Sequence, residues 1–200
     1  LEKDLAVLTW LGVDQITYYP LMVSNSTQQV MGKKLGTVNY NRGYAFYKKI
    51  TQTLSSSYRP STAWCFSRND SMIDEYVVHY EEYAGLGSGS IGYIGGSAYA
   101  NTFDIPSYIQ KVSAGIMPIA AKKDFSLKEK LHYDFLMKLF GMNIDLKQLQ
   151  AKHNTNVYWS LWPEISFFWL TGALNKRGSS LSLTVKGQYY WVIMMREFFI

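Results

Sequence analysis

The densest group of residues that could carry chemistry is the glycine-rich stretch 85–96, which reads Gly-Leu-Gly-Ser-Gly-Ser-Ile-Gly-Tyr-Ile-Gly-Gly. Gly87, Gly89 and Gly92 match the G-x-G-x-x-G spacing with which a strand–turn–helix unit binds the phosphates of a dinucleotide. The surroundings argue against such a site, because further glycines stand where the helix should run and no acidic residue lies about 20 residues further on. Glycines also let a backbone approach a ligand or another chain segment closely, so the stretch indicates either a binding wall or an ordinary loop after a strand.

The other polar candidates form no complete site. His79, Glu81 and Glu82 are close in the sequence, but on a strand only His79 and Glu81 share a face, which favours a solvated edge over a metal site. His132 and His153 stand on separate predicted helices without a partner pattern, and we expect them at the surface or half-buried. A set of tyrosines predicts either ordinary core or the lining of an aromatic pocket for a macrocycle. These residues are Tyr18, Tyr19, Tyr40, Tyr44 and Tyr47.

The elements that must position these residues alternate between helix and strand up to about residue 110. Apolar residues at helical spacing predict the helices, and short runs rich in β-branched and aromatic residues predict the strands. The predicted order is helix 1–11, strand 13–21, helix 39–54, strand 61–67, strand 80–87 and helix 105–112. Such alternation predicts an α/β fold with parallel strands covered by helices.

The later part of the chain is predicted to be mostly helical. Ser126 and Glu129 form a capping box that starts a long helix, Asp145 starts a shorter one, and Pro163 lies near the start of a third. A short strand at 181–184 and a final helix complete the pattern. Three helices, a turn and a short β element in this order are typical of a winged helix, a common docking module for nucleic acids and proteins.

Composition predicts a folded chain without a membrane span. Of 200 residues, 48% are hydrophobic and 18% charged, which suffices for a packed core. No apolar run reaches the roughly 18 residues that a span requires, and no secretion signal opens the chain, so we expect a cytoplasmic protein. The first residues, Leu-Glu-Lys-Asp, suggest a piece of a longer protein.

Positive charge is concentrated in the second part of the chain. Residues 111–200 hold 12 Lys and Arg against 6 Asp and Glu, whereas residues 1–110 hold 8 against 9. This asymmetry indicates an anionic partner, either a nucleic acid or a polycarboxylate. Together with the stretch 113–123, which has no sustained period and contains Gly115 and Pro118, it predicts a domain boundary near residue 112.

Several motifs resemble one known family when they are taken in order along the chain. One is Glu82-Tyr-Ala-Gly-Leu-Gly-Ser-Gly-Ser, followed by Tyr99-Ala-Asn101 and a helix. The others are Leu11-Gly-Val-Asp-Gln-Ile-Thr-Tyr-Tyr-Pro-Leu upstream, and Phe125-Ser-Leu-Lys-Glu-Lys, Leu136-Met-Lys-Leu-Phe, Gly172-Ala-Leu and Leu183-Thr-Val-Lys-Gly-Gln downstream. Together they resemble the oxygen-independent coproporphyrinogen III oxidase family of radical S-adenosylmethionine (SAM) proteins, over nearly the whole chain.

The resemblance implies a fold and two domains. Residues 1–112 would form the later part of an incomplete, TIM-like radical SAM barrel, and residues 113–200 a mostly helical, winged-helix-like C-terminal domain. Active sites of such barrels lie at the C-terminal ends of strands, where the glycine-rich stretch is also expected.

The resemblance also implies a set of cofactor-binding residues. Ile91 matches the position at which the family packs an apolar side chain beside the SAM adenine, although an ordinary core position is the alternative for this residue. Its neighbours around SAM would be Gly85, Gly87 and Gly89, and another part of the wall would be Tyr19 and Pro20.

Two features of the family do not occur here. The Cys-x3-Cys-x2-Cys motif and the glycine-rich site for the SAM amine are absent from the sequence, and Cys65 cannot replace three spaced thiolates. The resemblance therefore implies the C-terminal portion of an enzyme that, as a whole, uses SAM and a [4Fe–4S] cluster to form a 5′-deoxyadenosyl radical. This portion alone is expected to retain neither cofactor and to be inactive.

The implied activity is the oxidative decarboxylation of coproporphyrinogen propionates in haem biosynthesis. The ending Tyr189-Tyr-Trp-Val-Ile-Met-Met-Arg-Glu-Phe-Phe differs from the usual oxidase ending, so a haem-binding chaperone and an anaerobic haem-modifying radical SAM protein stay open as alternatives. A nucleic-acid-binding winged helix is a third alternative, favoured only by the positive charge. We expect a tetrapyrrole or haem as the partner, and neither nucleic acid nor a membrane.

Overall fold

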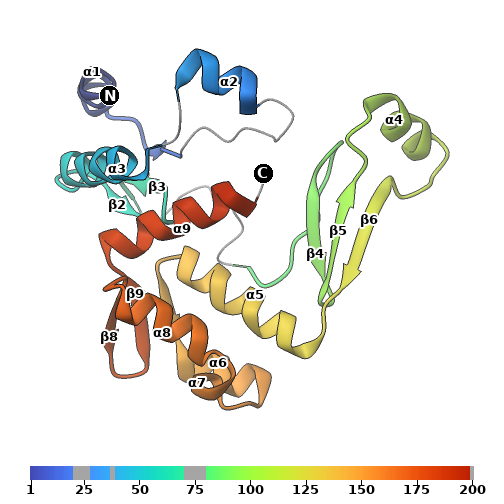
Figure 1. Ribbon diagram of the computed structural model, residues 1–200. Helices are drawn as coiled ribbons and strands as arrows, with labels where there is room; N and C mark the ends of the chain where they lie inside the picture. Colours follow the sequence, from blue (N-terminus) through green and yellow to red (C-terminus); the bar gives the residue numbers. More distant parts are fainter. Residues whose placement is uncertain (20–27, 37–38, 70–79, 199–200) are drawn as a thin grey trace.

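The computed structural model describes residues 1–19, 28–36, 39–69 and 80–198, which form helices and small sheets (Figure 1). The sheets have the strand orders β1-β3-β2, β4-β5-β6 and β7-β9-β8, and their described neighbours all pair antiparallel. The α/β class is confirmed, but the predicted parallel pairing is wrong for these strands. Turns of two residues join β4 to β5 and β8 to β9, and a connection that short permits only antiparallel neighbours.

The first part of the chain is a small sheet with helices packed against it. Its elements are α1 (Glu2–Leu11), β1 (Gln15–Thr17), α2 (Gln28–Leu35), α3 (Tyr40–Leu54), β2 (Arg59–Pro60) and β3 (Cys65–Ser67). Both predicted helices are confirmed, and Asn39 caps α3 by accepting a hydrogen bond from the Arg42 backbone N–H at 2.9 Å. The residues that join α1 and α3 to the sheet are Leu5, Ile16, Ile50, Leu54, Tyr58 and Phe66.

The middle part is an antiparallel meander that contains the glycine-rich stretch. Its elements are β4 (Ile91–Ile94), β5 (Ser97–Asn101), α4 (Ile105–Ser113) and β6 (Ile119–Asp124). The strand predicted over 80–87 is wrong, since these residues form only an isolated bridge between Tyr83 and Tyr93; glycines offer few side chains for a strand to pack. β6 pairs with β5 from beyond residue 112, so this sheet crosses the predicted boundary, while the division into two domains stays a prediction.

The last part combines helices with a small sheet. Its elements are α5 (Leu127–Phe140), β7 (Asn143–Asp145), α6 (Leu146–His153), α7 (Val157–Ser160), α8 (Trp162–Leu170), β8 (Leu174–Arg177), β9 (Ser180–Leu183) and α9 (Val185–Phe198). The predicted capping box is confirmed at the start of α5, where Ser126 and Glu129 each bond to the backbone N–H of the other. Asp145 caps α6, as predicted, through the Lys147 backbone N–H at 2.8 Å.

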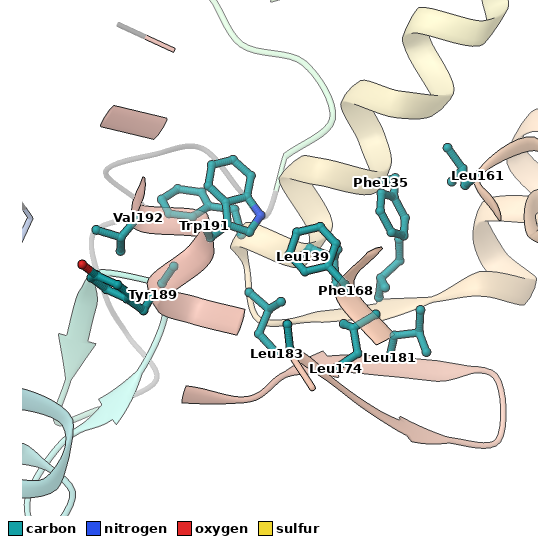
Figure 2. Packing of buried hydrophobic residues seen from close by; sticks show 14 of the residues in the cluster. Phe135, Leu139, Leu161, Phe168, Leu174, Leu181, Leu183, Tyr189, Trp191 and Val192 are labelled. Atoms are coloured by element: carbon teal, nitrogen blue, oxygen red, sulfur yellow. The ribbon is translucent and has the colours of Figure 1, made fainter. Parts of the chain in front are cut away.

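The main hydrophobic core lies between these helices and the β8–β9 hairpin. Figure 2 shows Leu139, Leu174, Leu181 and Leu183 gathered there with Phe135. The same core includes residues from the first part of the chain, namely Tyr47, Ala63, Trp64 and Cys65. The first and last parts therefore share one core. None of the described helices is both long enough and apolar enough to span a membrane.

Candidate functional site

The backbone of the glycine-rich stretch is held by side chains of β5 and α4. The Gly85 N–H donates to the Tyr99 hydroxyl at 3.0 Å, and the Gly87 N–H donates to the Tyr108 hydroxyl at 3.2 Å. The Gly89 N–H donates to a backbone carbonyl, that of Thr102, at 2.9 Å. A phosphate loop needs free N–H groups directed at its ligand, and these three are used inside the protein. The stretch also continues into a strand instead of a helix, so the dinucleotide interpretation is wrong.

Asn101 is the central residue of this network. It is only 3% exposed, and its Nδ2 lies 3.2 Å from the Gly85 carbonyl, 3.1 Å from the Gly87 carbonyl and 3.0 Å from the Ser90 hydroxyl. One side chain thereby fixes both ends of the first turn of the stretch. Asn101 and Tyr99 belong to the family motif, but the motif alone does not predict their hydrogen bonds to the turn.

Different physical constraints require glycine at the different positions of the stretch. A Cβ on Gly85 would overlap the Ile91 carbonyl, and one on Gly89 would meet the Phe103 ring, so these positions serve close approach within the chain. Gly87 has φ +103°, which disfavours any other residue, and the space beside it is open. Of Gly85, Gly87 and Gly89, Gly87 is therefore the one with open space beside it for a ligand.

Ile91 lies next to this turn at the start of β4. Ile91 is 47% exposed, so it is not part of the core that the described residues form. Leu86, within the turn itself, is 88% exposed. The geometry thus presents an apolar side chain and an open glycine on one short segment, which suits contact with a flat, apolar ligand surface.

The other predicted part of the site lies on the first sheet. Tyr19 follows β1 and packs beside Trp64 with ring centroids 5.9 Å apart, and Pro20 lies outside the described residues. Figure 1 shows the β1–β3 sheet apart from β4, with the end of α9 between them. Tyr19 thus lies beside Trp64 and lines a cavity with residues of α3 and α9, whereas the side chains that accept from the Gly85 and Gly87 N–H groups belong to β5 and α4.

Some of the predicted tyrosine pocket is present. Tyr18, Tyr19 and Tyr47 line an apolar cavity of about 250 Å³ between β1, α3 and α9, together with Tyr189. Tyr44 packs on the Tyr189 ring, with centroids 5.3 Å apart. Burial raises the pKa of Tyr47, whose hydroxyl donates to the Ala63 carbonyl and lies 2.9 Å from the Gln188 Oε1. The cavity is smaller than the roughly 300–1,000 Å³ of most small-molecule sites.

The histidines have partners that sequence analysis missed. His153 Nε2 lies 2.7 Å from Asp134 Oδ2, with both side chains 10% exposed, and His132 Nε2 lies 2.8 Å from Glu164 Oε1. Asp134 lies on the same helix as the buried residues Leu131 and Phe135, and a buried carboxylate needs a partner. Its position in the sequence could therefore have indicated that it is paired.

Lys152 connects this pair to the segment before the glycines. Its ammonium lies 2.8 Å from Asp134 and 3.1 Å from Glu81. Burial acts to lower the pKa of Lys152, but the two carboxylates outweigh it and hold the pKa above the ordinary lysine value. His79 lies outside the described residues, and among those described no group of three His, Cys, Asp or Glu side chains could hold a metal ion.

The residues of this chain do not fit a [4Fe–4S] cluster. The sequence has a single cysteine, Cys65, which is 1% exposed, and its Sγ accepts a hydrogen bond from Gln15 Nε2 at 2.6 Å. A cluster needs several thiolates that face it. Ile91 and the space beside Gly87, in contrast, are accessible, and their assignment to a SAM site stays a prediction.

Comparisons with known proteins bear on the fold. No family model matches the chain, and no curated protein matches it. Among solved structures, the coproporphyrinogen III oxidase HemN from Escherichia coli, a radical SAM enzyme, matches with a TM-score of 0.69 at 12% identity. The match covers 100% of this chain and 52% of that enzyme, so the chain spans about half of the enzyme's length. The resemblance inferred from the sequence is thus confirmed at the level of the fold: the chain folds like part of this radical SAM enzyme.

Proposed function

We propose that this chain is the C-terminal portion of a radical SAM oxidoreductase that acts on a tetrapyrrole, by oxidative decarboxylation of propionates as in oxygen-independent coproporphyrinogen III oxidases. The observation that carries the proposal is the structural match along the entire chain to HemN. It agrees with motifs that point to the same family from the sequence alone. Haem biosynthesis in the cytoplasm is the corresponding pathway and location.

The proposal divides the chain into the later part of a radical SAM barrel and a winged-helix-like domain. A winged helix has helices followed by a hairpin that pairs with an earlier short strand. The last part of the chain has this order, since the β8–β9 hairpin follows the helices α5 to α8 and β9 pairs with the earlier strand β7. This order supports the winged-helix assignment. The described sheets of the first 124 residues pair antiparallel, so the parallel strands of the proposed barrel would come from elsewhere in the protein. The boundary consistent with the β5–β6 pairing then falls after Asp124 instead of after residue 112.

In the proposed site, Gly87 and Ile91 lie against the SAM adenine. Gly85 and Gly89 hold the turn in place through their internal contacts, and Tyr19 and Pro20 belong to a separate part of the SAM wall. Asn101 keeps the turn rigid, so that the apolar contact needs little ordering when SAM binds. The [4Fe–4S] cluster, ligated by cysteines outside this chain, would supply the electron that cleaves SAM.

The test is an anaerobic turnover assay on the full-length protein with its cluster reconstituted. Incubation with SAM, a reductant and coproporphyrinogen III should produce 5′-deoxyadenosine together with decarboxylated porphyrinogens, measured by mass spectrometry. SAM cleavage that requires haem instead would favour the haem-modifying alternative, and haem binding without any SAM cleavage would favour the chaperone. Absence of both SAM cleavage and tetrapyrrole binding would overturn the proposal.

A further inference from the structure

A cleft lies between α5, the end of α6 and the α7–α8 segment. Its volume is about 630 Å³, within the roughly 300–1,000 Å³ typical of small-molecule sites. Leu131, only 3% exposed, is a buried residue in its lining. The side chains that the argument uses are Leu127, Lys128, His153, Trp159 and Trp162.

The walls of the cleft expose large apolar side chains. Trp159 is 77% exposed, Trp162 60% and Leu127 81%. Leaving such surface in water is unfavourable, and a patch of this kind around a hollow marks a binding site more often than an isolated exposed leucine does. Two indole rings beside one cleft suit a flat ligand, because aromatic faces stack on planar π-systems.

One cation at the cleft has no carboxylate partner. Among the described residues, no ion pair is made by the Lys128 ammonium, which is exposed at the start of α5. The nearby acids are engaged elsewhere, Glu164 by His132 and Asp134 by Lys152 and His153. The cleft therefore offers a free positive charge beside its apolar walls, which suits a ligand with a carboxylate at its edge.

The single imidazole in the lining is also oriented. The contact of His153 Nε2 with Asp134 fixes the ring, and Nδ1 has no hydrogen-bond partner in the part of the chain that the structure describes. Carboxylates orient metal-binding histidines in this way. Because the His153 side chain is only 10% exposed, the iron of a ligand would reach Nδ1 only if the ring moves towards the cleft, and a metal-free ligand would not use it.

We infer that this cleft binds a planar tetrapyrrole, with Trp159 and Trp162 against the ring and Lys128 paired with a peripheral carboxylate. The inference rests on the proposed function for the class of ligand and adds a site for it on the helical part of the chain. Size, aromatic walls and a single unpaired cation all fit a large flat molecule with acidic side chains.

The test is a fluorescence titration of the full-length protein with coproporphyrin III, the metal-free probe. Trp159→Ala, Trp162→Ala and Lys128→Gln should each raise Kd about five- to tenfold, since one stacked ring or one ion pair is lost. The matched controls are Trp169→Ala, 52% exposed on the same helix but outside the cleft, and Lys48→Gln on α3. Both controls should bind as the wild type does, and thermal melts should be the same for all five variants.

A second titration uses haemin and distinguishes an iron-bearing tetrapyrrole from a metal-free one as the ligand of the cleft. If the cleft takes the iron-bearing form, His153→Gln should weaken haemin binding and shift its Soret band while leaving coproporphyrin III binding unchanged. If it takes the metal-free form, His153→Gln should change neither, and the tryptophan variants still weaken coproporphyrin III.

The outcomes separate this inference from the proposed function. Tetrapyrrole binding by the wild type that none of the cleft variants weakens would overturn the cleft and leave the function standing. No binding of either tetrapyrrole by the wild type at micromolar concentration would overturn the cleft, and the proposed function falls with it only if SAM cleavage is absent as well.

Discussion

The glycine-rich meander and the helical last part are stabilised in opposite ways. The meander, residues 85–124, has few buried apolar side chains, and its helix α4 buries none. Its glycine-rich turn is held instead by hydrogen bonds that Asn101 donates and that the Tyr99 and Tyr108 hydroxyls accept. The last part is built on closely packed apolar residues such as Phe135 and Leu139, both 0% exposed.

The difference indicates that side-chain hydrogen bonds can select one backbone conformation where few apolar side chains are buried. In the meander, much apolar surface faces outward, as at Phe103, Ile105 and Ile109, and is free for contact with other surfaces. In the last part of the chain, apolar side chains such as that of Phe135 are buried and stabilise the fold. Substitutions of the same type should therefore have different consequences in the two regions.

The largest expected effect compares two phenylalanines. Phe135→Ala removes a fully buried ring from the main core and should lower the free energy of unfolding by about 3–5 kcal/mol. Phe103→Ala removes a ring that is 78% exposed and should change it by less than about 0.5 kcal/mol. Urea denaturation followed by circular dichroism measures both, and similar losses for the two variants would contradict the comparison.

The next prediction concerns the hydrogen bonds of the meander. Asn101→Ala leaves the Gly85 and Gly87 carbonyls without their side-chain donor and should cost about 1–3 kcal/mol. Hydrogen exchange should quicken at the amides of the glycine-rich turn before it does so in α5. Asn175→Ala, on the exposed face of β8, is the control and should leave exchange unchanged. Equal exchange in wild type and Asn101→Ala would show that the turn does not depend on this residue.

A third prediction tests the assignment of Ile91 to a SAM wall. Ile91 and Ile94 are each 47% exposed on β4, and because their spacing is odd they lie on opposite faces of the strand. Ile91→Asp should weaken SAM binding about tenfold or more, since a carboxylate must lose water against an apolar face, whereas Ile94→Asp should not. Calorimetry on the reconstituted full-length protein measures the affinity, and thermal melts check that neither variant unfolds.

Three results would decide this prediction. Loss of SAM affinity in Ile91→Asp alone supports the wall. Unchanged affinity in both variants, or a loss accompanied by a lowered melting temperature, would remove Ile91 from the site.

Features that depend on residues close in the sequence could be predicted, whereas features that depend on distant residues could not. Helix starts and ends could be predicted because they depend on neighbours a few residues away, such as Ser126 with Glu129 or Asn39 with Arg42. Strand direction could not, because alternation of helix and strand does not specify which strands pair or whether a two-residue turn reverses the chain. β6 was missed altogether, since it is a largely exposed strand whose partner β5 lies about 20 residues earlier.

The candidate site shows the same limit. The family motif located the glycine-rich turn, but the exposure of Ile91 and the internal use of the glycine N–H groups depend on contacts across the meander. The Asp134–His153 pair joins two helices, and no spacing rule predicts such a pair.

The smallest expected effect is the pH dependence of the α5 capping box, where the helical part meets β6. The Lys123 ammonium, 2.6 Å from Glu129, and the Ser126 N–H and hydroxyl lower the pKa of Glu129 from 4.5 to about 2. Because the folded pKa lies below the unfolded one, this contribution to stability is present above about pH 4.5 and is lost as the pH falls towards 2. Glu129→Gln should therefore flatten the fall of the melting temperature between pH 5 and about pH 2.

Lys123→Gln is the matched partner of that change. It removes the main cause of the lowered pKa, so it should flatten the same acid limb, and the double variant should add little to Glu129→Gln alone. Glu129 is exposed to water, which screens such a pair, so the shift in melting temperature should be small compared with that of Phe135→Ala. Melts of the three variants at closely spaced pH values measure it, and an acid limb as steep in Glu129→Gln as in the wild type would show that the capping box contributes no pH-dependent stability.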